Sequence, residues 1–185
     1  MQDGFHHVVA EALEALPRQI AAINLAAFPG RLAQGTVSRT AVGSNRMTVE
    51  FRKFEVDDLA AALDLWSQSE GLELGASDSP ERLEAFLARN PGLSWVALRG
   101  ADLAGAALCG HDGRRGYIHH LAVVPSERRS GIGRALFERC LSALRNAGIV
   151  KCHIFVFRAN PFGELFWSST GWQRRDDVDM FSHFL

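Results

Sequence analysis

The chain has 185 residues, of which 47% are hydrophobic and 22% are charged, and its formal net charge is −1. This composition supplies enough apolar surface for one packed domain and excludes global disorder. A net charge so close to zero gives no basis for a nucleic acid or a membrane surface as the partner.

Cysteine usage and the first residues bear on location. The three cysteines, Cys109, Cys140 and Cys152, have no paired spacing, which favours a reducing compartment. The first residues lack the basic stretch of a secretory signal, and no apolar run is long enough to cross a bilayer. We therefore expect a cytoplasmic protein. No metal is expected, because the histidines near Cys109 lack the spacing of paired ligands.

Residues 1–46 differ in sequence pattern from the rest of the chain. Apolar residues between Phe5 and Leu25 recur near a 3.6-residue period, which predicts a helix that Pro17 should kink. Residues 31–46 are rich in small and polar residues and are predicted to be a linker. Two interpretations stay open. The region is either an upstream extension without a role in the domain, or an arm whose apolar stripe packs on a second subunit of a homodimer.

Residues 47–185 carry the pattern of one domain of the α/β (α+β) class. In chain order, the predicted elements are a strand over 48–54, helices over 56–69 and 80–90, strands over 94–99, 103–109 and 117–124, a helix over 135–147, a strand over 149–158, a helix over 160–170 and a final strand over 178–185. Ser79 before Pro80 marks a helix start. The helix between the strands at 117 and 149 indicates a crossover that makes those two strands parallel.

The segment that follows the strand at 117–124 is rich in arginine and glycine and reads Glu127-Arg128-Arg129-Ser130-Gly131-Ile132-Gly133-Arg134. A helix start offers N–H groups without intrahelical partners and the positive end of the helix dipole. Gly131 and Gly133 let the backbone approach phosphate oxygens, and the arginines add charge and forked donors. A P-loop would need Lys and then Ser or Thr where Arg134 and Ala135 stand, and a dinucleotide fingerprint would need a third glycine. The segment therefore predicts a diphosphate ligand.

The spacing Arg128-x-x-Gly131-x-Gly133 resembles the coenzyme A loop of the GNAT (Gcn5-related) N-acetyltransferases. The resemblance extends upstream to Leu121-Ala122-Val123-Val124-Pro125 and downstream to Asn160, Phe166-Trp167 and Gly171-Trp172. Small bacterial RimI- and YpeA-like members are nearest in pattern. The resemblance implies the GNAT fold for residues 47–185, a mixed central β-sheet flanked by helices, preceded here by the N-terminal helical extension.

The resemblance also implies an activity. An amine, on a small molecule or a protein, would attack the thioester of the co-substrate acetyl-CoA directly, in a ternary complex. The strand ending at Val123 would pair with the pantetheine arm, and a bulge in it would free backbone donors. The N–H of Val123 would stabilise the charge on the thioester oxygen. The implied cofactor-binding residues are Leu121, Ala122, Val123, Arg128, Arg129, Ser130, Gly131, Ile132, Gly133, Arg134, Asn160, Phe166 and Trp167.

Strict alternation divides the side chains of this strand between two faces, with Tyr117, His119, Leu121 and Val123 on one and Ile118, His120 and Ala122 on the other. In the resembling family, a Glu or His on the first face takes the proton of the amine. His119 is therefore the expected general base, because its ordinary pKa of about 6.5 suits neutral pH. The alternative is a histidine that only fills a strand position, which is also what we expect of His120.

Two positions depart from the family pattern. Trp167 stands where the family's tyrosine protonates the leaving thiolate, so Tyr117 or water takes that role, or the thiolate leaves unprotonated. Phe155 stands where RimI-like enzymes carry a carboxylate base. These departures keep a catalytically silent acyl-CoA-binding sensor or interaction module as the alternative function. A third hypothesis is nucleotide-phosphate binding without coenzyme A. Glu70 and Glu73 are either solvated or line the acceptor side.

Overall fold

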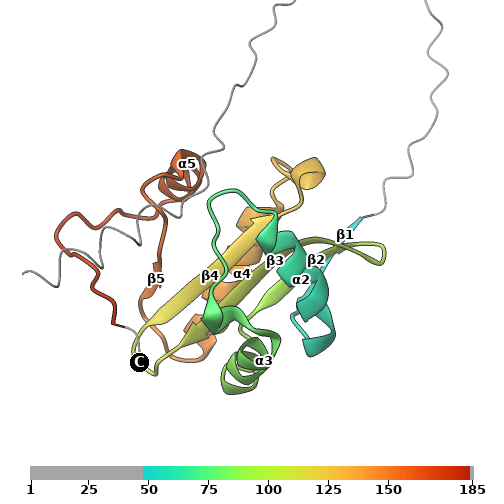
Figure 1. Cartoon of the computed structure of the whole chain (residues 1–185), viewed down its shortest axis with the longest axis horizontal. Helices are drawn as coiled ribbons and strands as arrows, with labels where there is room; N and C mark the ends of the chain where they lie inside the picture. Colours follow the sequence, from blue (N-terminus) through green and yellow to red (C-terminus); the bar gives the residue numbers. More distant parts are fainter. Residues whose placement is uncertain (1–47, 184–185) are drawn as a thin grey trace, which may run out of the picture. The chain divides into compact units, whose positions relative to one another are not determined.

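The computed structural model describes residues 48–183 (Figure 1). The helix and linker predicted within residues 1–46 lie outside the described residues. The proposed boundary between residues 46 and 47 therefore stays a prediction. Within the described part of the chain, none of the helices has the length and apolar character needed to cross a bilayer.

Five strands form one mixed sheet in the order in which they occur along the chain. They are β1 (Val49–Lys53), β2 (Trp95–Arg99), β3 (Asp102–His111), β4 (Gly116–Val123) and β5 (Cys152–Ile154). Neighbours from β1 to β4 pair antiparallel, and β4 pairs parallel with β5. The parallel pair confirms the crossover that the sequence predicted between these two strands.

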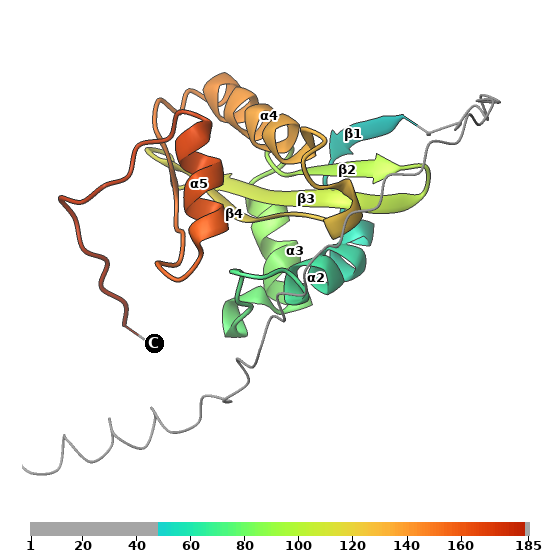
Figure 2. The ribbon, with the colours of Figure 1, turned by 90° about the horizontal axis from the view of Figure 1, so that it is seen from above.

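The helices cover both faces of this sheet. They are η1 (Val56–Asp58), α2 (Leu59–Ser67), η2 (Ala76–Asp78), α3 (Pro80–Arg89), η3 (Pro125–Glu127), α4 (Ile132–Asn146) and α5 (Pro161–Ser169). In Figure 2, α2 and α3 lie on one side of the sheet and α4 and α5 on the other. Trp66 and Leu83 anchor the apolar cluster under α2 and α3, while Leu136 and Phe137 anchor the cluster under α4. The mixed sheet flanked by helices is thus confirmed.

Local sequence signals explain where the helices begin. Ser79 caps α3, because its hydroxyl oxygen accepts a hydrogen bond from the backbone N–H of Arg82 at 3.4 Å, and Pro80 opens the first turn. Asn160 caps α5 in the same way, with its side-chain oxygen accepting from the N–H of Gly163 at 2.8 Å. The apolar side chains of α4 recur on one face, which the sheet buries.

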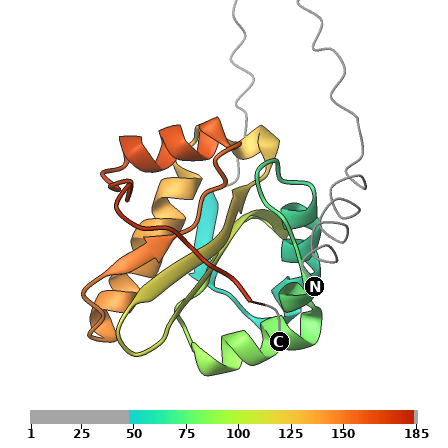
Figure 3. The same cartoon turned by 60° about the vertical axis from the view of Figure 1, so that its left-hand side comes forward.

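The C-terminal part departs from the prediction in two places. The predicted strand over 149–158 is reduced to β5, which pairs with β4 only between Gly116–Ile118 and Cys152–Ile154. The predicted strand over 178–185 is wrong for its described part, since residues 178–183 form no strand (Figure 3). Met180 and Phe181 are 69% and 92% exposed. An apolar, β-prone run forms a strand only where a partner strand satisfies its backbone, and this segment has none among the described residues.

Candidate active site

A groove opens where β4 and β5 separate. Its volume is about 950 Å³, and its walls come from the loop between α2 and η2, from β4, from the start of α4 and from the segment between β5 and α5. Of the predicted site residues, those in its lining are His119, Leu121, Ala122, Val123, Arg128, Arg129, Gly131, Ile132, Gly133, Arg134, Asn160, Phe166 and Trp167. Ser130 and Tyr117 are not part of the lining. The structure therefore brings segments far apart in sequence to one site.

The backbone of Val123 faces this groove. Val124 N donates to Ala104 O at 3.0 Å, so the neighbouring pair of Gly105 and Val123 is a non-hydrogen-bonded pair of the β3–β4 ladder. The N–H and C=O of Val123 consequently point away from β3, toward the side on which β5 has diverged. The carbonyl oxygen accepts a hydrogen bond from Nε of Arg128 at 3.1 Å. The N–H is left directed at the groove.

The loop between η3 and α4 presents backbone donors at one end of the groove. Gly131 precedes the first helical residue with a φ of 87°, in the left-handed region that glycine favours, and Arg129 has a φ of 59°. The first N–H groups of a helix have no intrahelical partner, and no side chain among residues 48–183 caps this helix start. A Cβ built on Gly131 would meet nothing within 4 Å, which shows that the loop faces open space. Such a helix start is suited to hold an anion.

Charged side chains around this loop leave it net positive. Arg128 and Arg129 are exposed and line the groove. The one carboxylate in this part of the lining, Glu127, is paired with Arg99 of β2, with Nε to Oε1 at 2.7 Å. Arg134 pairs with Glu138 at 2.8 Å on the exposed side of α4. The diphosphate site predicted from sequence is therefore an electropositive loop at a groove end.

A bulge in β4 changes which residues share a face. Leu108 lies opposite His119 while Ala106 lies opposite Ala122, so β4 carries one extra residue, and His120 has a φ of 44°. The bulge that the resemblance implied is thus confirmed.

The alternation predicted for this strand is wrong beyond His119, because the extra residue reverses it. Both histidines now lie toward α2 and α3: the His119 ring meets Phe86 at a centroid distance of 5.9 Å, and the His120 ring meets Trp66 at 5.2 Å. Ile118, Leu121 and Val123 instead pack with the cluster under α4.

The two histidines have different surroundings. Burial, and then the like charge of His120, lower the pKa of His119, and within residues 48–183 its ring makes no hydrogen bond. His120 Nε2 lies 2.6 Å from Asp78 Oδ1, and both side chains are mostly buried. Asp78 was not recognised in the sequence, because nothing local marks a pair of residues 42 positions apart.

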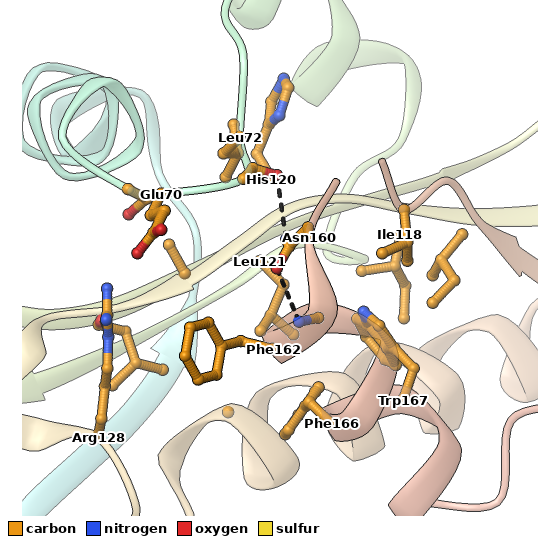
Figure 4. Close-up of a pocket in the computed structure, with 18 of the residues that line it drawn as sticks. Glu70, Leu72, Ile118, His120, Leu121, Arg128, Asn160, Phe162, Phe166 and Trp167 are labelled. Atoms are coloured by element: carbon orange, nitrogen blue, oxygen red, sulfur yellow. Dashed lines mark hydrogen bonds between the residues drawn. The ribbon is translucent and has the colours of Figure 1, made fainter. Parts of the chain in front are cut away.

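Asn160 joins the two walls of the groove. Its Nδ2 donates to the carbonyl oxygen of Gly71 at 3.3 Å, while its side-chain oxygen caps α5 (Figure 4). The loop that contains Gly71 also contributes Glu70 and Glu73 to the lining. Phe162 and Leu165 of α5 are apolar residues of the same lining, and they are 70% and 69% exposed. The sequence prediction missed these two, although their exposure on a short helix beside Asn160 is consistent with lining a site.

Trp167 belongs to an aromatic wall. The distances between ring centroids are 4.9 Å from Trp167 to Phe166, 5.0 Å to Trp172 and 5.5 Å to Phe137. Tyr117 lies beside the groove, where its ring stacks on His119 at 6.1 Å and on Phe155 at 6.3 Å. Within residues 48–183, no group of three or more His, Cys, Asp or Glu side chains could hold a metal ion.

A family model, a curated protein and two solved structures that are similar to this chain are all acetyltransferases. Residues 59–171 match the model of the Acetyltransferase (GNAT) family. Acetyltransferase ECA0875 of Pectobacterium atrosepticum is 33% identical over 112 residues, which cover 60% of this chain and 79% of that protein. The PaiA N-acetyltransferase of Thermoplasma acidophilum, solved with coenzyme A, has a similar fold, with a TM-score of 0.63 and 21% identity over 71% of this chain and 94% of that one. An acetyltransferase from Clostridium acetobutylicum, solved with acetyl-CoA, has a TM-score of 0.61 and 20% identity over 73% and 96% of the two chains.

Proposed function

Because this chain belongs to the GNAT acetyltransferase family, we propose that its groove holds acetyl-CoA and a primary amine together, so that the amine attacks the thioester directly in a ternary complex. The chain is an N-acetyltransferase, and acetyl-CoA is its acyl donor. The proposal concerns the route, the residues that carry it and the nature of the acceptor, which is an amino group on a small molecule or a protein. The RimI-like subtype stays a prediction.

The residues present fit the donor. The uncapped start of α4 and the open face of Gly131 suit a diphosphate, and Arg128, Arg129 and Arg134 supply positive charge around it. Ser130 would contribute its backbone only, because its hydroxyl donates to the carbonyl oxygen of Glu127. The rest of the groove is largely apolar, which suits the uncharged arm of the ligand.

The observation that carries the proposal is the direction of the Val123 N–H. It points into the space between β4 and β5, where an extended ligand can lie along β4 as an added strand. Leu121 and Ala122 would line that ligand, and the Val123 N–H would donate to the thioester oxygen as negative charge develops. A backbone donor of this kind is worth on the order of 3 kcal/mol. Asn160 would exchange its bond to Gly71 for one to the pantetheine arm.

The proton of the amine must leave near the moment of attack. His119, the base expected from sequence, and His120 both line the groove. Trp167 offers no acidic proton for the thiolate, so Tyr117, water or departure without protonation completes the step. A Tyr117→Phe variant separates these routes: a lowered kcat assigns the proton to Tyr117, and an unchanged kcat assigns it elsewhere.

Thiol release from acetyl-CoA, measured with a panel of spermidine, kanamycin and a peptide carrying free α- and ε-amino groups, tests the proposal. Turnover with at least one amine, and an acetylated product of the matching mass, supports it. Tight coenzyme A binding without turnover of any amine would instead favour the acyl-CoA sensor. Binding of adenosine diphosphate as strong as that of coenzyme A would favour a nucleotide-phosphate site.

Location and assembly belong to the same proposal. We propose a cytoplasmic protein, a location supported by three free cysteines, Cys109, Cys140 and Cys152, two of which are buried. We also propose that residues 1–46 cover a second copy in a homodimer, without nucleic acid or membrane as partner. Light scattering on the full chain measures the mass in solution, and a monomer would refute the dimer.

A further inference from the structure

The β4 bulge places His120 in a left-handed backbone conformation, with a φ of 44°. His120 is one of two non-glycine residues with a positive φ among residues 48–183, and a left-handed conformation is unfavourable for a residue that carries a side chain. Strain of this kind persists where the surroundings fix it, which is common at functional sites. Here the surroundings are the Trp66 ring, 5.2 Å away, and the Asp78 carboxylate.

The two carboxylate oxygens of Asp78 have different partners: one contacts the His120 ring and the other contacts the backbone of the loop that carries Asp78. Its Oδ1 lies 2.6 Å from His120 Nε2, and its Oδ2 accepts a hydrogen bond from the N–H of Gly75 at 2.8 Å. The side chains of His120 and Asp78 are 17% and 15% exposed. His120 lines the groove and Asp78 does not, so the carboxylate stands behind the ring. In Figure 4 the His120 ring lies on the side that carries Leu72, well away from Arg128.

This arrangement fixes the state of the imidazole. A carboxylate only accepts hydrogen bonds, so the neutral ring must carry its proton on Nε2, and Nδ1 keeps the lone pair. When the ring takes up a second proton, the adjacent carboxylate stabilises the resulting charge. His119 has no such hydrogen-bonded partner, because its ring packs between Phe86 and Tyr117 and makes no hydrogen bond within the described residues.

We propose that His120 is the catalytic base of the acetyl transfer and that Asp78 is the positioning residue that sets its tautomer. The assignment rests on the proposed function. The amine nitrogen forms the new C–N bond, the C–S bond breaks, and its electron pair leaves on sulfur. The proton passes from the amine nitrogen to Nδ1 of His120, and from there to the thiolate or to water.

Asp78→Asn is a sharp test, because Gly75 fixes the orientation of the new amide. The N–H of Gly75 needs an oxygen acceptor, so the amide oxygen stays there and the NH₂ group turns toward His120. Nε2 must then accept, which moves the ring proton to Nδ1 and removes the lone pair that takes the substrate proton. Two-dimensional ¹H–¹⁵N imidazole spectra, recorded without any acceptor, read the tautomer directly. The Nε2–H form is expected in the parent and the Nδ1–H form in Asp78→Asn.

Kinetics with the amine that gives turnover provides the second readout. His120→Asn keeps a side chain that tolerates the left-handed backbone, and it should lower kcat about a hundredfold, the usual range for loss of a general base. Asp78→Asn should also lower kcat at least about tenfold. In both variants KM for acetyl-CoA should stay within about twofold, since neither residue lies at the diphosphate loop. His153→Asn on β5 and Asp64→Asn on α2, both outside the groove lining, are the matched controls, and thermal unfolding confirms that each variant is folded.

Several results overturn the assignment. One is an Nδ1–H tautomer in the parent; another is an unchanged tautomer in Asp78→Asn with full activity. A loss of kcat in His119→Asn together with full activity in His120→Asn returns the base to His119 and leaves the acetyltransferase proposal intact. If the parent turns over no amine while binding coenzyme A, the proposed function fails and the role of His120 fails with it.

Discussion

The carbonyl oxygen of Val123 accepts a hydrogen bond from Nε of Arg128, which ties the end of β4 to the loop at the start of α4. One side chain thus links the backbone proposed to meet the thioester with the loop proposed to hold the diphosphate. The two ends of the donor site are therefore coupled through a single guanidinium, and this coupling can be measured.

Arg128→Gln should raise KM for acetyl-CoA about tenfold, because charge-assisted hydrogen bonds contribute about 1.5–3 kcal/mol. kcat should change less than KM, since the Val123 N–H itself remains. Steady-state kinetics with varied acetyl-CoA measures both. Arg114→Gln, an exposed arginine in the β3–β4 turn outside the groove lining, is the control. Equal KM values for the two variants would contradict the role of Arg128.

Gly71→Ala should weaken coenzyme A binding by about threefold to tenfold, the range for one hydrogen bond. A Cβ at Gly71 would lie 2.1 Å from Nδ2 of Asn160, so the Asn160 side chain must move from its place across the groove. Gly148→Ala is a matched control, because both glycines have a φ of 77°. A Cβ introduced at Gly148 would have no described atom within 4 Å. Both variants should lose similar stability from backbone strain, and calorimetry should show weaker binding only in Gly71→Ala. A similar affinity in the two would argue against Asn160 as a ligand contact.

His119 should make the folded state more sensitive to acid. Burial and the nearby His120 lower the pKa of His119 in the folded protein, so below the ordinary value of about 6.5 the unfolded chain binds the proton more readily. This contribution to stability is present above that pH and is lost as the pH falls toward the folded pKa. His119→Phe should therefore flatten the dependence of the unfolding free energy on pH below about pH 6.5. Urea unfolding at several pH values checks this, and an unchanged slope would contradict it.

The pair of Arg52 and Asp58 should stabilise the junction of β1 with η1. Two hydrogen bonds, Nη1 to Oδ2 at 2.6 Å and Nη2 to Oδ1 at 2.7 Å, join the side chains, and the Asp58 side chain is 10% exposed. Burial acts to raise the pKa of Asp58, but the hydrogen bonds from Arg52 and from the Glu55 N–H outweigh it and lower the pKa. Arg52→Met should lower the free energy of unfolding by about 2 kcal/mol.

Arg174→Met is the control for that pair, because Arg174 and Glu164 are 55% and 52% exposed and such pairs contribute less than about 1 kcal/mol. In the parent, the contribution of Asp58 should be lost as the pH falls below its ordinary value of about 4, and this loss should be smaller in Arg52→Met. Equal destabilisation by Arg52→Met and Arg174→Met would contradict the larger contribution expected of the Arg52–Asp58 pair.

Local signals account for the parts of the fold that sequence predicted well. Ser79 with Pro80 predicted the start of α3, and the apolar period of residues 135–147 predicted α4, although this helix begins three residues earlier, at Ile132. Caps and amphipathic faces are predictable because they depend on neighbours a few residues apart. The loop from Arg128 to Gly133 was recognised for the same reason. All of these features are contained within single short segments.

Features set by long-range pairing were not predictable in the same way. The position of the bulge depends on how β4 aligns with β3, so simple alternation misplaced the side chains after His119. The contact of Asp78 with His120 joins two segments through the tertiary fold. The β-prone run at 178–183 has no partner strand within residues 48–183, and no local pattern reveals this.

Calorimetry with coenzyme A on Gly131→Asp and Gly113→Asp tests the central claim most directly. The two glycines have φ values of 87° and 92°, and neither has an atom within 4 Å of a built Cβ, so the backbone strain of the two substitutions is matched. Only Gly131 adjoins the first turn of α4, where a carboxylate would repel the diphosphate. Binding should be abolished in Gly131→Asp and retained in Gly113→Asp, whereas parent-like heat from Gly131→Asp would contradict the account.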